Sequence, residues 1–334
     1  MDALSDVLKV SRLTGGVFLH AEFFAPWCVA TKVSPEYCSP ALGPTPHVIP
    51  YHYVVEGALR IRVGGDDGPL LALGPGEIVM IPHNDLHIMG SDLDLTPVPG
   101  RQIMQLPARG QLWAMRHGGD GPRTRVVCGF LGCADRESNP VLASLPSILK
   151  LTLDEGSAAE WIRSTLRFAA EEVAAGRPGS DTVLEKVSEL LFIEAVRRYA
   201  ERLPPEQTGW LAGLRDPHVS RALALIHGDV AHPWTVDELG REAGVSRSVL
   251  AERFTRLLGM PPIHYLARWR MQAAMQALLT TSASVAEVAD RIGYESEAAF
   301  SRAFKKATGT APATWRRAGP SPATELSRSA RAQS

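Results

Sequence analysis

The sequence predicts an α+β multidomain chain with an N-terminal β-barrel, a helical connector and a C-terminal all-α domain. Three observations carry this prediction. Short β-rich runs separated by turn residues fill the first part of the chain. From about residue 139 the apolar residues recur at helical spacing, and one helical pattern occurs twice. At 334 residues the chain also exceeds one ordinary core, so we expect more than one domain.

The composition is that of a folded globular protein, with 45% apolar and 21% charged residues. No apolar run approaches the ~18 residues of a membrane span. The start, MDALSDVLKV, lacks a basic stretch followed by an apolar core, so we expect no signal peptide, no membrane partner and a cytoplasmic location. The four cysteines are too few for a disulfide scaffold and are expected to be reduced.

The net charge of −1 conceals an asymmetry along the chain. Residues 216–317 carry 13 Lys and Arg against 10 Asp and Glu. Nucleic-acid binding requires such local positive charge, although an uneven but solvated surface would give the same count.

Residues 1–135 are predicted to form the barrel. The β-rich runs GVFLHAEFF, PYHYVVEG, ALRIRV, EIVMIP and RVVCGFL are separated by turn sequences such as VGGDDGP and LGPGE. Many short strands with regular turns indicate a sandwich or barrel. Residues 91–125 are rich in Pro and Gly and are expected to form an insertion or flexible loop.

Residues 136–203 are predicted to be a helical connector, because 161–176 and 180–203 both have helical periodicity. These helices could brace the barrel or form a dimer interface. Residues 204–218 contain two prolines and are expected to be a linker, and 318–334 are expected to be a disordered tail.

Residues 219–317 are predicted to be all-helical and contain an internal repeat. GVSRSVLAERFTRLLGMPP begins at Gly244 and GYESEAAFSRAFKKATGTAP begins at Gly293. The matched pairs are Gly244 and Gly293, Ser246 and Ser296, Leu250 and Phe300, Phe254 and Phe304, Gly259 and Gly309, and Pro262 and Pro312.

Each copy follows a Ser/Thr-x-x-Glu sequence, TVDE at 235–238 and SVAE at 284–287, which predicts two capping boxes. A short helix, a glycine turn and a longer helix with a Ser N-cap make a helix-turn-helix unit, whose second helix enters the DNA major groove. A generic helical hairpin would explain one copy, but two copies with matching caps favour DNA binding. The helical pattern at 263–279 would set the two units apart by about one DNA turn, ~34 Å.

Residues 219–317 resemble the DNA-binding domain of AraC/XylS-type transcription regulators. The resemblance is carried by LGREAGVS, FTRLLGMPP, YLARWRMQ, VADRIGYESEAAFSRAFKKATGTAP and TWRR. It implies a transcription regulator, not an enzyme, with double-stranded DNA as its partner and RNA polymerase as a further one.

By family position, two sets of residues are expected to face DNA. They are Arg247, Ser248, Ala251, Glu252 and Arg256 in the first unit, and Glu297, Ala298, Ser301, Arg302 and Lys305 in the second. Arg302 is the leading candidate for a base contact, because Arg can pair with guanine through two hydrogen bonds. Lys305, Lys306 and Arg268 are expected at phosphates. Glu252 could accept from cytosine, but an ion pair with Arg256 is the favoured interpretation.

The sequence VVEGALRIRV…LALGPGEIVMIPHNDLH resembles the cupin barrel, and more narrowly the cupin-type sensor domain of AraC-type regulators. NPVLASLPSIL fits the segment that follows the barrel in that subgroup. Asn84 stands in a position that is usually Gly. The resemblance implies an effector sensed in the barrel and a homodimer.

Enzymatic cupins bind a metal through three His and a carboxylate. Here Pro50 stands where the Glu ligand is expected, and His52, two residues further on, would point to the same inward face of its strand. His52 and His87 are therefore expected to be inward neighbours. Cys128 and His20 could complete a His/Cys set suited to zinc or another transition metal, with His47, Cys28 and Cys38 in reserve.

Three interpretations of these residues remain open: buried structural side chains, a metal site, or thiols that respond to oxidants or electrophiles. A cupin metalloenzyme with an accessory DNA-binding module is the alternative function. No nucleophile–base pair or phosphate-binding glycine loop stands out in the sequence. We therefore expect a regulator controlled by an effector, metal or redox signal.

Overall fold

The computed structural model describes residues 3–11, 13–34, 47–105, 113–133, 139–151, 180–204 and 206–318, with single positions between 160 and 175. The chain divides into two compact units. The barrel unit comprises Leu13–Arg136 and Leu145–Tyr199, and the helical unit comprises Met1–Arg12, Glu137–Ser144 and Ala200–Ser334. Within the described residues, no helix combines the length and hydrophobicity that crossing a bilayer would require. The expected tail lies outside the described residues from 319 onward.

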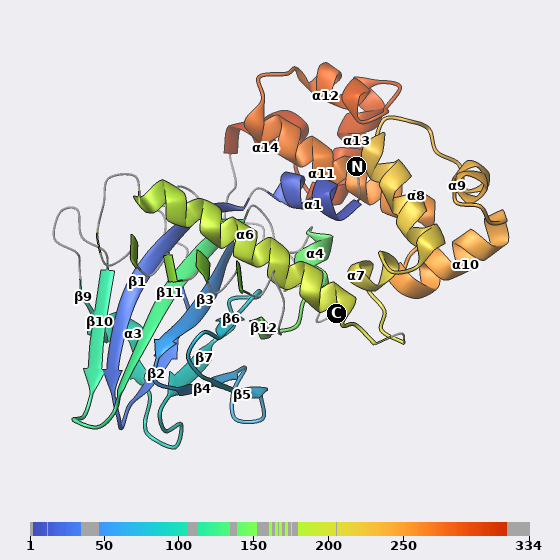
Figure 1. Ribbon diagram of the computed structural model, residues 1–334. Helices are drawn as coiled ribbons and strands as arrows, with labels where there is room; N and C mark the ends of the chain where they lie inside the picture. Colours follow the sequence, from blue (N-terminus) through green and yellow to red (C-terminus); the bar gives the residue numbers. More distant parts are fainter. Residues whose placement is uncertain are drawn as a thin grey trace. The chain divides into compact units, whose positions relative to one another are not determined.

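The barrel unit is built from two β-sheets (Figure 1). Its described strands are β1 (Thr14–Phe24), β2 (Cys28–Thr31), β3 (His47–Glu56), β4 (Leu59–Val63), β5 (Leu70–Leu73), β6 (Ile78–Met80), β7 (His87–Gly90), β8 (Val98–Pro99), β9 (Met104–Gln105), β10 (Trp113–Gly118), β11 (Arg123–Cys133) and β12 (Leu149–Leu151), with a short helix α3 (Gly100–Ile103). Among the described residues, a seven-stranded sheet has the order β12-β6-β3-β11-β1-β10-β9, and a five-stranded sheet has the order β5-β4-β7-β2-β8.

Each of the five β-rich runs singled out in the sequence contains an observed strand, namely β1, β3, β4, β6 and β11. The expectation of a loop over 91–125 is wrong in part. β10 lies in this stretch and pairs in parallel with β1, placing Ala114 opposite His20. The surrounding glycines conceal the strand in the sequence, whereas burial of Met115 in the core stabilises it.

Alternation along the strands defines the core between the sheets. Leu19, Ala21 and Phe23 of β1 belong to one buried apolar cluster with residues from both sheets. The Phe23 ring stacks on Trp27 with centroids 4.0 Å apart. His20, one residue out of step, therefore points to the opposite face of the seven-stranded sheet.

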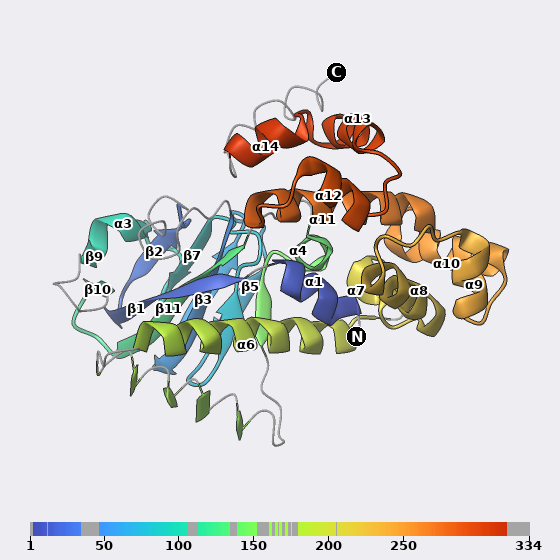
Figure 2. The ribbon, with the colours of Figure 1, turned by 90° about the horizontal axis from the view of Figure 1, so that it is seen from above.

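The opposite face of this sheet is covered by α6 (Ser180–Glu201), which lies across its strands (Figures 1 and 2). The Tyr51 hydroxyl on β3 is hydrogen-bonded to the Ser188 hydroxyl on α6 at 2.8 Å, and both residues are buried. A Cβ atom at Gly129, opposite Tyr51 on β11, would lie 2.2 Å from the Tyr51 ring. This part of the connector therefore braces the barrel.

The helical unit holds the other helices whose bounds lie within the described residues. They are α1 (Ala3–Ser11), α4 (Pro140–Ser144), α7 (Trp210–Gly213), α8 (Pro217–Gly228), α9 (Val236–Glu242), α10 (Arg247–Leu258), α11 (Pro262–Thr280), α12 (Val285–Arg291), α13 (Glu297–Thr308) and α14 (Pro312–Ala318). Two domain boundaries differ from expectation. α1 groups with the helical unit and not with the barrel, and the expected linker contains α7, where Trp210 and Leu211 are buried.

The internal repeat is confirmed as two helix-turn-helix units, the first made by α9 and α10 and the second by α12 and α13. The Ser246 and Ser296 hydroxyls accept hydrogen bonds from Val249 and Ala299 backbone N–H groups, which caps α10 and α13. Each of these helices ends at a left-handed glycine, Gly259 or Gly309.

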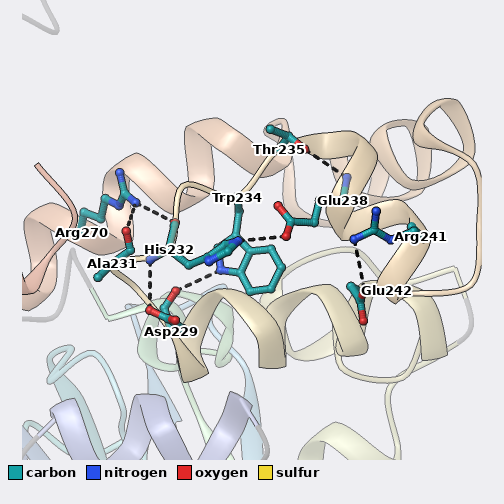
Figure 3. Close-up of polar contacts among 9 residues, drawn as sticks. All are labelled: Asp229, Ala231, His232, Trp234, Thr235, Glu238, Arg241, Glu242 and Arg270. Carbon is teal, nitrogen blue, oxygen red and sulfur yellow. Dashed lines mark hydrogen bonds and ion pairs between the residues drawn. The ribbon is translucent and has the colours of Figure 1, made fainter. Parts of the chain in front are cut away.

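The two expected capping boxes do not both form. At α12, the Ser284 hydroxyl accepts from the Glu287 N–H and the Glu287 carboxylate accepts from the Ser284 N–H. At α9, Thr235 caps the Glu238 N–H, but the Glu238 carboxylate contacts His232 Nε2 at 2.9 Å instead (Figure 3). The first capping box is therefore wrong, because a nearby histidine competes for the glutamate.

We expect Ser284→Ala to lower the free energy of unfolding of the helical unit by about 1 kcal/mol, because the first turn of α12 loses its hydroxyl cap. Urea denaturation followed by circular dichroism measures this change. Ser282→Ala, at an exposed position two residues earlier, is the control and should change stability by less than ~0.5 kcal/mol. Equal effects of the two substitutions would contradict the assignment of the cap.

Candidate functional site

The residues expected to face DNA lie on the outer faces of α10 and α13. Phe254 and Phe304 anchor the inner faces of these helices and are fully buried. On the outer faces Ala251 and Ser301 are half-buried, and the remaining expected residues are exposed: Arg247, Ser248, Glu252 and Arg256 on α10, and Glu297, Ala298, Arg302 and Lys305 on α13. The repeat thus presents two comparable polar faces.

The two faces differ in their charges. Arg247 of α10 pairs with Asp237 at 3.3 Å. Within the described part of the chain, Arg302, Lys305 and Lys306 of α13 form no ion pair. Three cations of α13 are therefore available to an anionic partner.

The expected ion pair between Glu252 and Arg256 is not formed between the described side chains. Both residues are exposed, and an exposed pair at this spacing gains at most about 0.5 kcal/mol, which does not hold two long side chains together. Glu252 thus stays on the outer face of α10 without this partner. Arg268 is exposed on α11, between the two helix-turn-helix units.

In the barrel unit, three of the expected site residues meet inside the apolar core. His52 on β3 and Cys128 on β11 are cross-strand neighbours, and His52 Nδ1 lies 3.0 Å from Cys128 Sγ. His52 Nε2 lies 3.0 Å from His87 Nε2 at the start of β7. All three side chains are at most 2% exposed. We call this set the Cys128–His52–His87 hydrogen-bond chain.

The backbone carbonyl of Asp85 decides where the protons lie in this chain. It can only accept a hydrogen bond, so His87 Nδ1, 3.0 Å away, carries a proton and His87 Nε2 accepts. His52 Nε2–H then donates to His87, and His52 Nδ1 accepts from the Cys128 thiol. This arrangement satisfies every polar atom of the chain with neutral side chains.

Burial holds the chain neutral. Desolvation lowers the pKa of His52 well below 6.5, with a further contribution from His87, and desolvation also lowers the pKa of His87. Burial raises the pKa of the Cys128 thiol to about 12. A neutral His52 offers no positive charge that would stabilise a thiolate.

The other expected ligands do not join the chain. His20 is half-buried on the opposite face of the sheet, and His47 Nε2 is hydrogen-bonded to the Pro82 carbonyl at 2.7 Å. Cys28 is buried on β2, and its pKa is raised by burial. Cys38 lies outside the described residues. In the described part of the chain no three His, Cys, Asp or Glu side chains converge on a point that could hold a metal ion, so the expected four-ligand set is not assembled.

Asn84 has a structural role beyond its departure from the usual Gly. Its φ of 54° lies in the left-handed region, which Asn tolerates better than most residues. Its amide accepts from the Val33 N–H at 3.1 Å and donates to the Val33 carbonyl at 2.7 Å. Asn84 thereby ties the turn before His87 to the segment after β2.

Comparisons with known proteins cover both units. A protein-family profile described as "Cupin" matches residues 2–201, and a profile described as "Helix-turn-helix domain" matches residues 239–318. An AraC-like transcription regulator from Streptomyces antibioticus is 33% identical over 317 residues, which cover 95% of this chain and 99% of that relative.

Two further relatives match over similar lengths. The HTH-type transcriptional regulator AlkR of Acinetobacter baylyi is 27% identical, with 95% of this chain and 99% of AlkR covered. The RCS-specific HTH-type transcriptional activator RclR of Escherichia coli K12 is 25% identical, with 95% and 97% covered.

These relatives are transcription regulators and not enzymes, so the alternative of a cupin metalloenzyme is not supported. The chain belongs to the AraC family of DNA-binding transcription regulators, with a cupin domain toward its N-terminus and helix-turn-helix units toward its C-terminus.

Proposed function

We propose that this regulator reads DNA with α10 and α13, and that a signal sensed at the Cys128–His52–His87 hydrogen-bond chain changes its affinity for DNA. The proposal of a sensing site rests on three titratable side chains that are hydrogen-bonded in series inside an otherwise apolar core. Such polar groups lower stability relative to apolar side chains of the same volume, which supports a chemical role for them.

The proposal of DNA recognition is supported by the residues on the outer face of α13. Its unpaired Arg302 has the planar guanidinium that recognises guanine, while Lys305 and Lys306 provide charge for the phosphate backbone. Each face carries one exposed acid, Glu252 on α10 and Glu297 on α13, but on α10 one of the two exposed arginines, Arg247, is already paired with Asp237. We therefore assign the larger share of base recognition to α13.

A transition-metal ion is the signal that the buried donors favour. The two facing Nε2 atoms of His52 and His87 lie 3.0 Å apart, which suits two bonds of about 2.0 Å to one ion. Cys128 lies on the other side of the His52 ring, so only the two histidines fit an ion in this conformation. An ion there would supply positive charge in place of the shared proton.

Oxidation of Cys128 is the less favoured signal. Burial raises the pKa of the Cys128 thiol and so disfavours the thiolate, which is the species that oxidants attack. An effector of either kind must favour one arrangement of the protein. A tenfold change in DNA affinity requires a difference of about 1.4 kcal/mol between the arrangements.

We further propose a homodimer that acts in the cytoplasm and contacts RNA polymerase. Val183 and Leu190 support the dimer, because they are exposed on α6 and are seven residues apart, on one face of the helix. An apolar stripe of this kind suits pairing with a second copy of α6.

Arg302→Ala should relax specificity at one base pair by about 1–3 kcal/mol, because the bidentate donor is lost. Affinities are measured by fluorescence anisotropy on a duplex selected from a random pool by the unaltered protein, and on its single-base variants. Lys306→Ala should instead weaken binding to all duplexes similarly and reduce the salt slope by about 1. Arg60→Ala, an exposed Arg on β4, is the control. Unchanged base discrimination in the Arg302 variant would refute its assignment.

His52→Gln and His87→Gln should each weaken zinc binding by more than about tenfold, because each removes one of the two facing nitrogens. Equilibrium dialysis with elemental analysis measures the bound zinc, and DNA affinity with and without zinc measures its consequence. His20→Gln is the matched control, and its zinc binding should equal that of the unaltered protein. Failure of the unaltered protein to bind zinc would remove the metal proposal and leave DNA binding untouched.

The barrel should lose stability as the pH falls below 6.5. His52 and His87 have folded-state pKa values below the unfolded value of about 6.5, so the unfolded chain binds more protons in acid. Each contributes a slope of up to about 1.4 kcal/mol per pH unit until its lowered pKa is reached.

Thermal unfolding of the unaltered protein and the His52→Gln/His87→Gln double variant between pH 7.5 and pH 5 tests this prediction. His20 and His227, whose pKa values are also lowered by burial, contribute alike in both proteins. The difference in Tm should therefore shrink in acid. Parallel Tm curves would contradict the neutral assignment of the two histidines.

A further inference from the structure

Arg270 lies at the middle of α11, where the helix passes from one helix-turn-helix unit to the other. On its N-terminal side, Tyr265 contacts Phe254 of the first unit, with ring centroids 5.6 Å apart. On its C-terminal side, Met271, Ala274 and Leu278 belong to the buried cluster of the second unit. A side chain at this point can therefore act on both units.

The Arg270 guanidinium donates to three successive backbone carbonyls. Its Nε donates to Val230 O at 2.9 Å. Its Nη2 donates to Ala231 O at 3.1 Å and to His232 O at 2.9 Å (Figure 3). These residues form the loop between α8 and α9, at the start of the first unit. The planar fork of Arg suits several fixed acceptors, which a Lys ammonium cannot reproduce.

The same loop is fixed by contacts of its own. The Asp229 carboxylate accepts from the His232 N–H at 3.0 Å, and the Asp229 carbonyl accepts from Trp234 Nε1 at 3.0 Å (Figure 3). Together with the His232–Glu238 contact, these bonds hold the carbonyls in place for Arg270. The loop is therefore a rigid part of the first unit.

The second unit reaches this loop directly at Gly293. A Cβ atom at Gly293 would lie 2.2 Å from Ala231 O and 2.7 Å from Arg270 Nη2. Gly244, its counterpart in the first unit, has nearly the same φ, +74° against +78°, but a Cβ atom there would meet nothing within 4 Å. The turn requires glycine in both units for its φ, and Gly293 alone also permits close approach to the other unit.

We infer that Arg270 and Gly293 are positioning residues that fix the two helix-turn-helix units in one relative arrangement, and thereby fix the spacing of the two DNA subsites that one chain reads. The inference rests on the proposed function, in which both α10 and α13 bind DNA. One inserted base pair separates two subsites by about 3.4 Å and rotates them by about 35°. A protein with a fixed arrangement should not tolerate that change.

The test uses the full chain and a duplex that it selects from a random pool. Its affinity is compared with that for the same duplex carrying one inserted or one deleted base pair between the subsites. The unaltered protein should lose affinity on the order of tenfold or more with either change. Arg270→Lys and Gly293→Ala should bind the selected duplex more weakly. In these variants one inserted or deleted base pair should lower the affinity by about threefold or less.

Gly244→Ala is the matched control, because it adds a Cβ at the same φ without touching the other unit. It should lower stability, yet one inserted or deleted base pair should still lower its affinity on the order of tenfold. A residue that acts only through stability reduces the folded fraction and weakens binding to every duplex equally. The inference is therefore overturned if folded Arg270→Lys or Gly293→Ala loses as much affinity on the altered duplexes as the unaltered protein does.

Failure of the proposed function is distinguishable from failure of this inference. If only one of the helices α10 and α13 binds DNA, Arg256→Ala or Arg302→Ala in the helix that does not bind leaves the affinity for the selected duplex unchanged. If both substitutions weaken binding and the unaltered protein still tolerates the inserted base pair, the proposed function holds and the inference fails. Should Gly293→Ala fail to fold, Arg270→Lys decides alone, since it keeps the charge and adds no atoms against the loop.

Discussion

Desolvation is the constraint on which both units of this protein depend. A polar group removed from water must find a partner or lose its charge. In the barrel this requirement leaves His52, His87 and Cys128 neutral and directs their hydrogen bonds toward the Asp85 carbonyl. In the helical unit it gives three loop carbonyls a common donor in Arg270. The same rule thus accounts for a neutral hydrogen-bonded set in one unit and for a shared hydrogen-bond donor in the other.

The two helix-turn-helix units share a plan but differ in the use of equivalent positions. Both have a Ser N-cap and a left-handed glycine at the end of the second helix. In the first unit Glu238 contacts His232, whereas in the second Glu287 completes a capping box. The first unit thereby fixes the loop that Arg270 holds. The second leaves Arg302 unpaired within the described residues, which suits a reader of DNA.

The barrel unit and the helical unit are not two consecutive parts of the sequence. The division into units places α1 and α4 with the helices, on either side of the barrel strands in sequence, so the chain passes between the units more than once. Of the strands that carry the buried histidines and Cys128, β11 is the last before the chain enters the helical unit at Glu137. A bound signal needs a free-energy difference of only 1–3 kcal/mol to alter DNA affinity measurably.

The sequence by itself determined the fold class, the repeat with its two serine N-caps and glycine turns, and the family, because these depend on local periodicity and on short fixed spacings. It also predicted that His52 and His87 lie near each other, since alternation along a strand sets the facing of a side chain. Only the tertiary structure decided that His20 lies on the other face, that His232 contacts the Glu238 carboxylate, and that β10 pairs with β1. It alone also decided that Arg270 joins α11 to the loop of the first helix-turn-helix unit. These groups are far apart in the sequence and come into contact only through packing, which local sequence patterns do not predict.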